Sequence, residues 1–286
     1  VSQDQPAQPI GDSVNVEDST SDNSRYEQNF VFASVVGDSI FLVPWLTRTT
    51  AYTDETVRET RGWLARSGTW DAFYAEEWKT PLTQTPTQML PYGNMRLLMQ
   101  EGDIVDRIIF DDSVRRLELA LGDVTASWSG PRGEVIDLVE GAAYILDERI
   151  EGLILYLARA SIGAAPPGGD WGLLISGDSL QLVFAANLEH GGEAEPLFRA
   201  WANIGQEERL WPEVRVDWAE VRAFPPARRD VPVSWFIRSP DGSIEGQLET
   251  VSAEIQPGSG PGPLLPVRAL FEVAGDIYTE EGLFPV

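Results

Sequence analysis

The chain has 286 residues, with 45 acidic and 21 basic side chains, a formal charge of −24, one histidine and no cysteine. This charge argues against nucleic-acid binding and against direct adhesion to an anionic lipid surface, and the lack of cysteine excludes disulfides, thiolate metal sites and cysteine nucleophiles. With 43% hydrophobic and 10% aromatic residues, the chain can bury a sizeable core in one large or two ordinary domains.

Residues 1–24 carry five acidic side chains, no basic one and few bulky apolar ones. Such a segment buries too little surface to offset the entropy of ordering, so we expect a flexible acidic tail. It is either an inert tether or an arm that orders on a partner. The chain begins at Val1, which export-signal cleavage or trimming would explain.

The first predicted β domain covers residues 25–148. Strands are expected at Phe30–Phe32 and Ile40–Val43, on either side of a Gly-Asp pair. Two short helices are then expected within residues 55–79. Asp54 would cap the first, which ends near Arg66, and Thr69 would cap the second, which ends near Lys79.

The second predicted helix carries an aromatic stripe, with Trp63 preceding it. Trp70, Phe73, Tyr74 and Trp78 recur at the spacing of one helical face. The stripe either packs onto a sheet as core or forms a docking ridge, because Trp and Tyr are enriched at interfaces. Residues 80–95 are rich in Pro, Thr and Gln and predict a long loop.

From residue 96 onward, apolar runs separated by Gly or Asp breaks predict successive β-strands of a sandwich or barrel. The expected strands are 96–100, 104–110, 114–121, 124–128, 135–139, 142–146 and 150–160, then 199–203, 214–224, 233–238, 244–253 and 267–273. Residues 150–160 are apolar on both faces, which predicts a strand buried on both sides. A second β domain is expected over residues 149–286.

A hairpin is predicted within residues 170–187. Trp171, Leu173 and Ile175 alternate along its first strand, and Leu180, Leu182 and Phe184 alternate along its second. Residues 176–179 between them include Gly and Asp, as hairpin turns do. Mainly β structure, in two antiparallel sandwich or barrel units with one or two short helices, is therefore the predicted fold.

Catalytic and cofactor motifs are sparse. His190 lies in a Gly-rich stretch without the further ligands of a zinc site or the partners of a triad, so we interpret it as a loop residue. Adjacent acidic pairs on a strand point to opposite faces and cannot act on one bond. No calcium loop or phosphate-binding glycine motif occurs, so no metal, cofactor or catalytic residue is assigned.

The order of elements after Gly141 resembles the lipocalin-like family of carotenoid 1,2-hydratase (hydroxyneurosporene synthase) and AttH. The residues that carry it are Gly141–Tyr144, Leu153–Tyr156 and the Trp171-Gly172 hairpin, with the runs Val231–Ile237 and Ala269–Gly275. The resemblance implies two lipocalin-like β-domains. Active members of that family carry a polar motif with His, whereas Asp170-Trp171-Gly172 has none, which favours a divergent, non-catalytic member.

Two functions from different classes follow. The first is a non-catalytic, membrane-extrinsic accessory subunit, located in the periplasm or elsewhere outside the cytoplasm, that docks on a membrane protein complex with a basic or apolar face. The resemblance points to a bacterial photosynthetic reaction-centre and light-harvesting complex. Docking would use Trp63, Trp70, Phe73, Tyr74 and Trp78.

The alternative is a carotenoid or lipid carrier, or a hydratase-like enzyme. The tryptophans Trp171, Trp201, Trp211, Trp218 and Trp235 would line an apolar cavity, unless they are sandwich core. An acid such as Asp217 or Glu272 would protonate a double bond there, because burial raises the pKa of a carboxyl.

Overall fold

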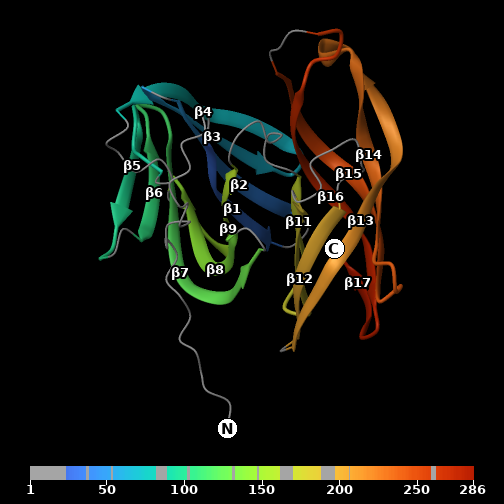
Figure 1. The fold of residues 1–286 in the computed structure, drawn as a ribbon. Helices are drawn as coiled ribbons and strands as arrows, with labels where there is room; N and C mark the ends of the chain where they lie inside the picture. The colour runs from blue at the N-terminus through green and yellow to red at the C-terminus, as the bar shows by residue number, and fades with distance from the viewer. Residues whose placement is uncertain are drawn as a thin grey trace. The chain divides into compact units, whose positions relative to one another are not determined.

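Two curled antiparallel β-sheets make up the fold in a computed structural model (Figure 1). The structure describes residues 24–36, 39–52, 54–81, 89–101, 104–130, 133–146, 148–161, 170–187, 197–205, 207–258 and 262–286. The chain divides into two compact units, 1–165 and 166–286, each built on one sheet. The predicted mainly β fold with two units is confirmed.

The first sheet has nine strands in the order β4-β3-β2-β1-β9-β8-β7-β6-β5. Their bounds are β1 Ser24–Val36, β2 Ser39–Ala51, β3 Thr56–Arg66, β4 Thr69–Thr80, β5 Met95–Met99, β6 Val105–Asp111, β7 Arg116–Ser129, β8 Val135–Ile145 and β9 Glu148–Ser161. In Figure 1 this sheet runs from blue to yellow-green.

Side chains from opposite ends of this sheet meet, which shows how strongly it curls. The ring of Phe73 on β4 lies 5.0 Å from that of Phe110 on β6. Asp71 of β4 forms an ion pair of 2.6 Å with Arg115, which precedes β7. The enclosed inner face carries one apolar core cluster that includes Phe30, Trp45 and buried residues of every other strand except β3, whose partly buried Leu64 packs against it. This cluster is called the first core below.

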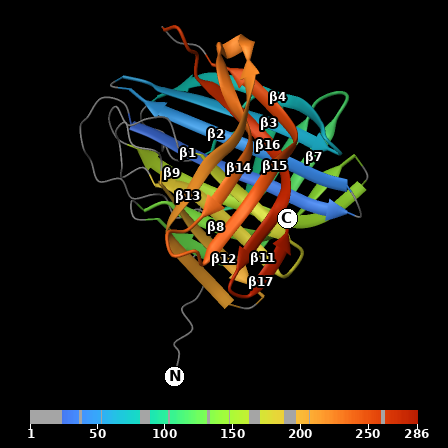
Figure 2. The same cartoon turned by 90° about the vertical axis from the view of Figure 1, so that its right-hand side faces the viewer.

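The second sheet has eight strands in sequential order, β10 to β17 (Figure 2). Their bounds are β10 Trp171–Ser176, β11 Leu180–Asn187, β12 Leu197–Ile204, β13 Glu207–Phe224, β14 Arg229–Arg238, β15 Ile244–Pro257, β16 Val267–Thr279 and β17 Gly282–Pro285, with a short 3-10 helix at Pro225–Ala227. One face carries a separate core cluster that includes Leu182, Val214 and Ile277. This cluster is called the second core.

The expected hairpin within residues 170–187 is present as β10 and β11. Trp171 pairs with Ala185 and Ser176 pairs with Leu180, and the turn between the strands contains Gly177 at φ 51°. The expectation for residues 150–160 is also met, since Ile154 to Arg159 are all buried, whichever face they occupy. Alternation of period two was therefore a sound guide in these segments.

The predicted boundary at 148/149 differs from the observed division. β9, which begins at Glu148, pairs with β1 along one edge and with β8 along the other. It is therefore a central strand of the first sheet, and the chain divides after Ala165. The predicted acidic tail, residues 1–24, lies outside the described residues except for Ser24, which begins β1.

The two predicted helices are wrong, because residues 56–66 and 69–80 form the hairpin β3–β4. Ser67 and Gly68 connect the strands at φ 49° and 79°, the conformation of a two-residue hairpin turn. A bulge between Gly62 and Trp63 shifts the register of β3 against β4. Phe73 is the extra residue at this bulge, and its side chain is buried in the first core together with that of its neighbour Tyr74. Two consecutive aromatic residues on one face of a strand give the same spacing in the sequence as one face of a helix.

Candidate active site

A single row of side chains crosses the inner face of the first sheet. Direct cross-strand pairing joins Ser127 to Asp137, Asp137 to Tyr156, Tyr156 to Phe30, and Phe30 to Trp45. Directly opposed residues point to the same side of an antiparallel sheet. Phe30, Trp45 and Tyr156 all belong to the first core. The strand register therefore brings a carboxyl and two hydroxyls next to aromatic rings of the first core.

Asp137 is the acidic group of this row. Its side chain is 1% exposed, and the Ser127 hydroxyl donates a hydrogen bond of 2.6 Å to its Oδ1. Burial raises the pKa of Asp137 from its ordinary value of 3.8 to about 6, and the hydrogen bond from Ser127 offsets only part of that rise. A carboxyl with this pKa is partly protonated near neutral pH and can act as a general acid.

Tyr156 is held by a short chain of hydrogen bonds. The backbone N–H of Met89 donates to Gln28 Oε1 at 2.6 Å, and Gln28 Nε2 donates to the Tyr156 hydroxyl oxygen at 3.1 Å. The first bond fixes which end of the amide is the acceptor, so the Gln28 NH₂ group must face Tyr156. Met89, which lies within the predicted loop of residues 80–95, is thereby tied to the inner face of β1.

Aromatic rings line the same interior. The ring of Phe30 lies 4.9 Å from that of Tyr156, and the ring of Trp45 lies 5.2 Å from Phe73 and 5.3 Å from Tyr74. The faces of aromatic rings attract cations, most strongly where water is excluded. An interior with one acid and several aromatic faces suits a reaction that passes through a positively charged carbon.

Polar side chains also gather near one end of β2 and β3. Arg58 on β3 is fully buried; its Nε donates to Thr80 Oγ1 at 3.0 Å, and its Nη1 lies 3.5 Å from Thr49 Oγ1. Burial lowers the pKa of Arg58 to about 10. Thr47 and Thr60 share a hydrogen bond of 3.1 Å on the same face. The interior is thus polar around Arg58 and apolar around Phe32 and Val43.

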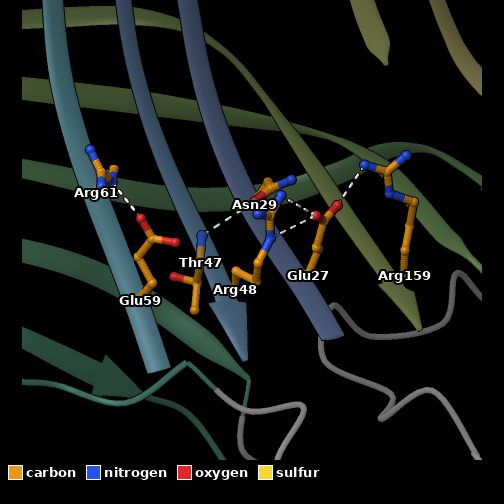
Figure 3. Close-up of polar contacts among 7 residues, drawn as sticks. All are labelled: Glu27, Asn29, Thr47, Arg48, Glu59, Arg61 and Arg159. Atoms are coloured by element: carbon orange, nitrogen blue, oxygen red, sulfur yellow. Dashed lines mark hydrogen bonds and ion pairs between the residues drawn. The ribbon is translucent and has the colours of Figure 1, made fainter. Parts of the chain in front are cut away.

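A second polar group lies on the opposite face of the first sheet (Figure 3). Glu27 on β1 forms ion pairs of 3.0 Å with Arg48 on β2 and 2.6 Å with Arg159 on β9. Burial raises the pKa of Glu27, but the two guanidinium groups outweigh that effect and hold the pKa below its ordinary value. Because one carboxylate holds guanidinium groups from the strands on both sides of β1, we interpret this group as a link between three neighbouring strands.

The predicted docking residues are largely enclosed. Phe73 and Tyr74 belong to the first core, and Trp78 is 9% exposed and stacks on Tyr92 at 4.7 Å. Trp63 is 2% exposed on the other face of β3, while Trp70 is half-buried. These five side chains therefore do not form one exposed ridge.

The predicted cavity tryptophans divide between the two faces of the second sheet. Trp235, which contacts Phe271 at 5.0 Å, and its cross-strand partner Trp218 lie on the face of the second core. Trp171 and Trp201 lie on the opposite face, by the alternation of their strands. Trp211 is part of the second core and donates to Ser243 Oγ at 2.9 Å.

The acids predicted as proton donors occupy different surroundings. Asp217 accepts a hydrogen bond of 2.7 Å from the exposed Arg238, as in a surface ion pair. Glu272 is 5% exposed and accepts a hydrogen bond of 2.6 Å from the Ser252 hydroxyl. Its side chain lies on the face of the second sheet opposite to the second core. His190 lies outside the described residues.

The sequence analysis did not single out Asp137 or Tyr156. One signal was present, since Asp137 interrupts the apolar run Val135–Val139, where an acid must either be paired or have a shifted pKa. Within the described parts of the chain no cluster of His, Cys, Asp or Glu is arranged to hold a metal ion. The same residues contain no helix long and apolar enough to cross a bilayer.

No protein-family model and no curated protein matches this sequence. Among solved structures, the chain is similar to a candidate AttH protein from Nitrosomonas europaea, with a TM-score of 0.62 and 10% identity over 98% of this chain and 96% of that one. It is also similar to kievitone hydratase from Nectria haematococca, with a TM-score of 0.54 and 11% identity over 98% and 93% of the two chains. At these identities the likeness shows a shared fold, which is lipocalin-like and found in a hydratase.

Proposed function

We propose that the chain is a hydratase-like enzyme that takes an apolar, unsaturated ligand such as a polyene into the first core and protonates it from Asp137. The observation that carries this proposal is the buried Asp137 carboxyl, with a pKa raised to about 6, in one row with Tyr156. The fold that the chain shares with kievitone hydratase is consistent with it. A carotenoid or lipid is the ligand class that the sequence suggested.

The proposed reaction adds water across a carbon–carbon double bond. The Asp137 carboxyl gives its proton to one alkene carbon, and the positive charge that develops on the conjugated system lies among the aromatic rings of Phe30, Trp45 and Tyr156. Water then bonds to the cationic carbon and releases a proton to the Asp137 carboxylate. The carboxyl is thereby regenerated, and the net change is alkene plus water to alcohol.

The role of a membrane-extrinsic accessory subunit stays a prediction. Its proposed docking surface is weakened by the burial of Trp63, Phe73, Tyr74 and Trp78. The proposal for Asp137 needs no such surface. We therefore prefer the enzyme to the docking subunit.

The test compares the wild type with Asp137→Asn and Glu272→Gln in ¹⁸O-labelled water, on a panel of polyenes from retinoids to carotenoids. Glu272 is the matched control because it is also buried and also bonded to a serine hydroxyl. We expect labelled alcohol from the wild type and from Glu272→Gln. Loss of a general acid should slow Asp137→Asn by a factor on the order of 100 or more. Equal turnover by Asp137→Asn, or no bound polyene and no product with the wild type, would refute the proposal.

A further inference from the structure

The indole N–H of Trp45 is a buried donor with no hydrogen-bond acceptor among the described residues. The side chain is 0% exposed, and its Nε1 atom has no partner there. A buried donor without an acceptor destabilises a protein by about 1–3 kcal/mol, so native structures contain few of them. The position of Trp45 in the row that contains Asp137 indicates what such a donor is for.

We infer that Trp45 selects ligands bearing an oxygen acceptor, so that the substrate class of the site is an extended, oxygenated polyene or related apolar molecule rather than a pure hydrocarbon. This inference rests on the proposed function, because it assigns a specificity-determining residue to the same interior. Asp137 would meet the double bond, and Trp45 would donate to an oxygen at the other end of the ligand.

The spacing of the strands sets the length of that ligand. Trp45 on β2 and Asp137 on β8 are separated by β1 and β9, and the register places both in one cross-strand row. Three strand spacings amount to roughly 14 Å along the sheet. A short, compact molecule cannot reach both groups, whereas an extended conjugated chain can.

The orientation and surroundings of Trp45 agree with this role. A Cβ atom at Gly62 would lie 3.2 Å from Cε3 of the indole, so the six-membered ring of Trp45 lies against β3. Met89 and Met95 belong to the same core cluster. Unbranched thioether side chains adapt to irregular space, so these two residues are the ones that can rearrange around a ligand.

The chain provides a matched control in Trp63. Its Nε1 atom also lacks an acceptor among the described residues, and its side chain is 2% exposed, but it lies on the opposite face of the first sheet. Trp45→Phe and Trp63→Phe remove the same N–H group and a similar volume. They differ in which face of the sheet loses the donor.

The experiment measures binding of all-trans-retinol and of its deoxy hydrocarbon, in which a methyl group replaces the hydroxymethyl group. We expect the wild type and Trp63→Phe to bind retinol about tenfold more tightly than the hydrocarbon, and Trp45→Phe to bind the two about equally. In the wild type, the indole ¹H–¹⁵N resonance of Trp45 should shift with retinol and not with the hydrocarbon, which tests the inference even if Trp45→Phe does not fold.

The outcomes separate this inference from the proposed function. Equal affinity of the wild type for both compounds, or the same ligand preference in both variants, overturns the role of Trp45 and leaves the role of Asp137 standing. Failure of the wild type to bind either compound or any longer polyene overturns both.

Discussion

Asp137 on β8 and Tyr156 on β9 are direct cross-strand partners on the inner face of the first sheet. Their hydrogen bonds run to different neighbours: Asp137 accepts from Ser127 on β7, and Tyr156 accepts from Gln28 on β1. Four adjacent strands thus contribute to one polar group inside an apolar core. This arrangement gives the buried carboxyl a fixed position and leads to the predictions below.

The stability of the Asp137→Asn variant relative to the wild type should depend on pH. The folded pKa of Asp137 is raised from 3.8 to about 6, so the folded state binds the proton more tightly than the unfolded state does. Below pH 3.8 the carboxyl is protonated in both states. As the pH rises through 6, the free energy of unfolding of the wild type falls by on the order of 3 kcal/mol, whereas Asp137→Asn, whose side chain is a neutral amide, does not lose this stability. Urea unfolding of both proteins at several pH values measures this difference, and a difference independent of pH would contradict it.

Removing the Tyr156 hydroxyl should destabilise the first unit. In Tyr156→Phe the Nε2 group of Gln28 loses its acceptor, at a cost of about 1 kcal/mol in the free energy of unfolding. Tyr278→Phe is the control, because Tyr278 is 52% exposed and should change stability by less than about 0.5 kcal/mol. Chemical denaturation monitored by tryptophan fluorescence compares them, and equal effects of the two variants would show that the Gln28 contact contributes nothing.

Neutralising Glu27 should be costly because Arg159, which is 5% exposed, then loses its ion pair with the Glu27 carboxylate. Breaking a buried ion pair from one side costs about 3 kcal/mol or more. Glu55→Gln is the control, since the ion pair of Glu55 with Lys79 is exposed to solvent and contributes little to stability. We expect Glu27→Gln to lower the thermal midpoint clearly and Glu55→Gln to leave it nearly unchanged.

The pH dependence of the Glu27 contribution has the opposite sign to that of Asp137. The folded pKa of Glu27 lies below its ordinary value of 4.5, so its stabilising contribution is present above that pH and disappears as the pH falls through the folded pKa. The gap in stability between the wild type and Glu27→Gln should therefore close in acid. A gap that stayed constant down to about pH 2 would contradict the assigned ion pairs.

A methyl group at Gly62 should disturb the aromatic packing of the first core. The Cβ of Gly62→Ala would lie 2.8 and 2.9 Å from two ring atoms of Phe73 and 3.2 Å from Trp45. Overpacking of this kind costs about 1–3 kcal/mol, which denaturation experiments can measure. Unchanged stability would mean that Phe73 moves aside freely, contrary to its burial between Trp45 and Phe110.

The sequence predicted the β architecture wherever alternation was regular, as in the hairpin of β10 and β11. It failed at β3 and β4, where a bulge near Gly62 placed Phe73 and Tyr74 in the same core and mimicked a helical stripe. Propensity and spacing are local signals, whereas a register shift depends on the neighbouring strand.

The candidate site could be predicted only in part. An acid within the apolar run Val135–Val139 marks Asp137 as unusual, but its neighbours Ser127 and Tyr156 come from strands that only the sheet order brings together. The sequence analysis placed the proton donor at Asp217 or Glu272, in an apolar cavity lined by the tryptophans of the second β domain. Both side chains lie on the face of the second sheet opposite to the second core and Trp235, because side chains alternate between the two faces along β13 and β16.

The most direct test of the account is a ¹³C NMR titration of the Asp137 carboxyl in the wild-type protein, with Asp137→Asn to assign the resonance. The account predicts a midpoint near pH 6, because the carboxyl is buried in an apolar core and only Ser127 offsets that burial. A midpoint near the ordinary value of 3.8 would mean that Asp137 is ionised at neutral pH, and would contradict its role as the proton donor.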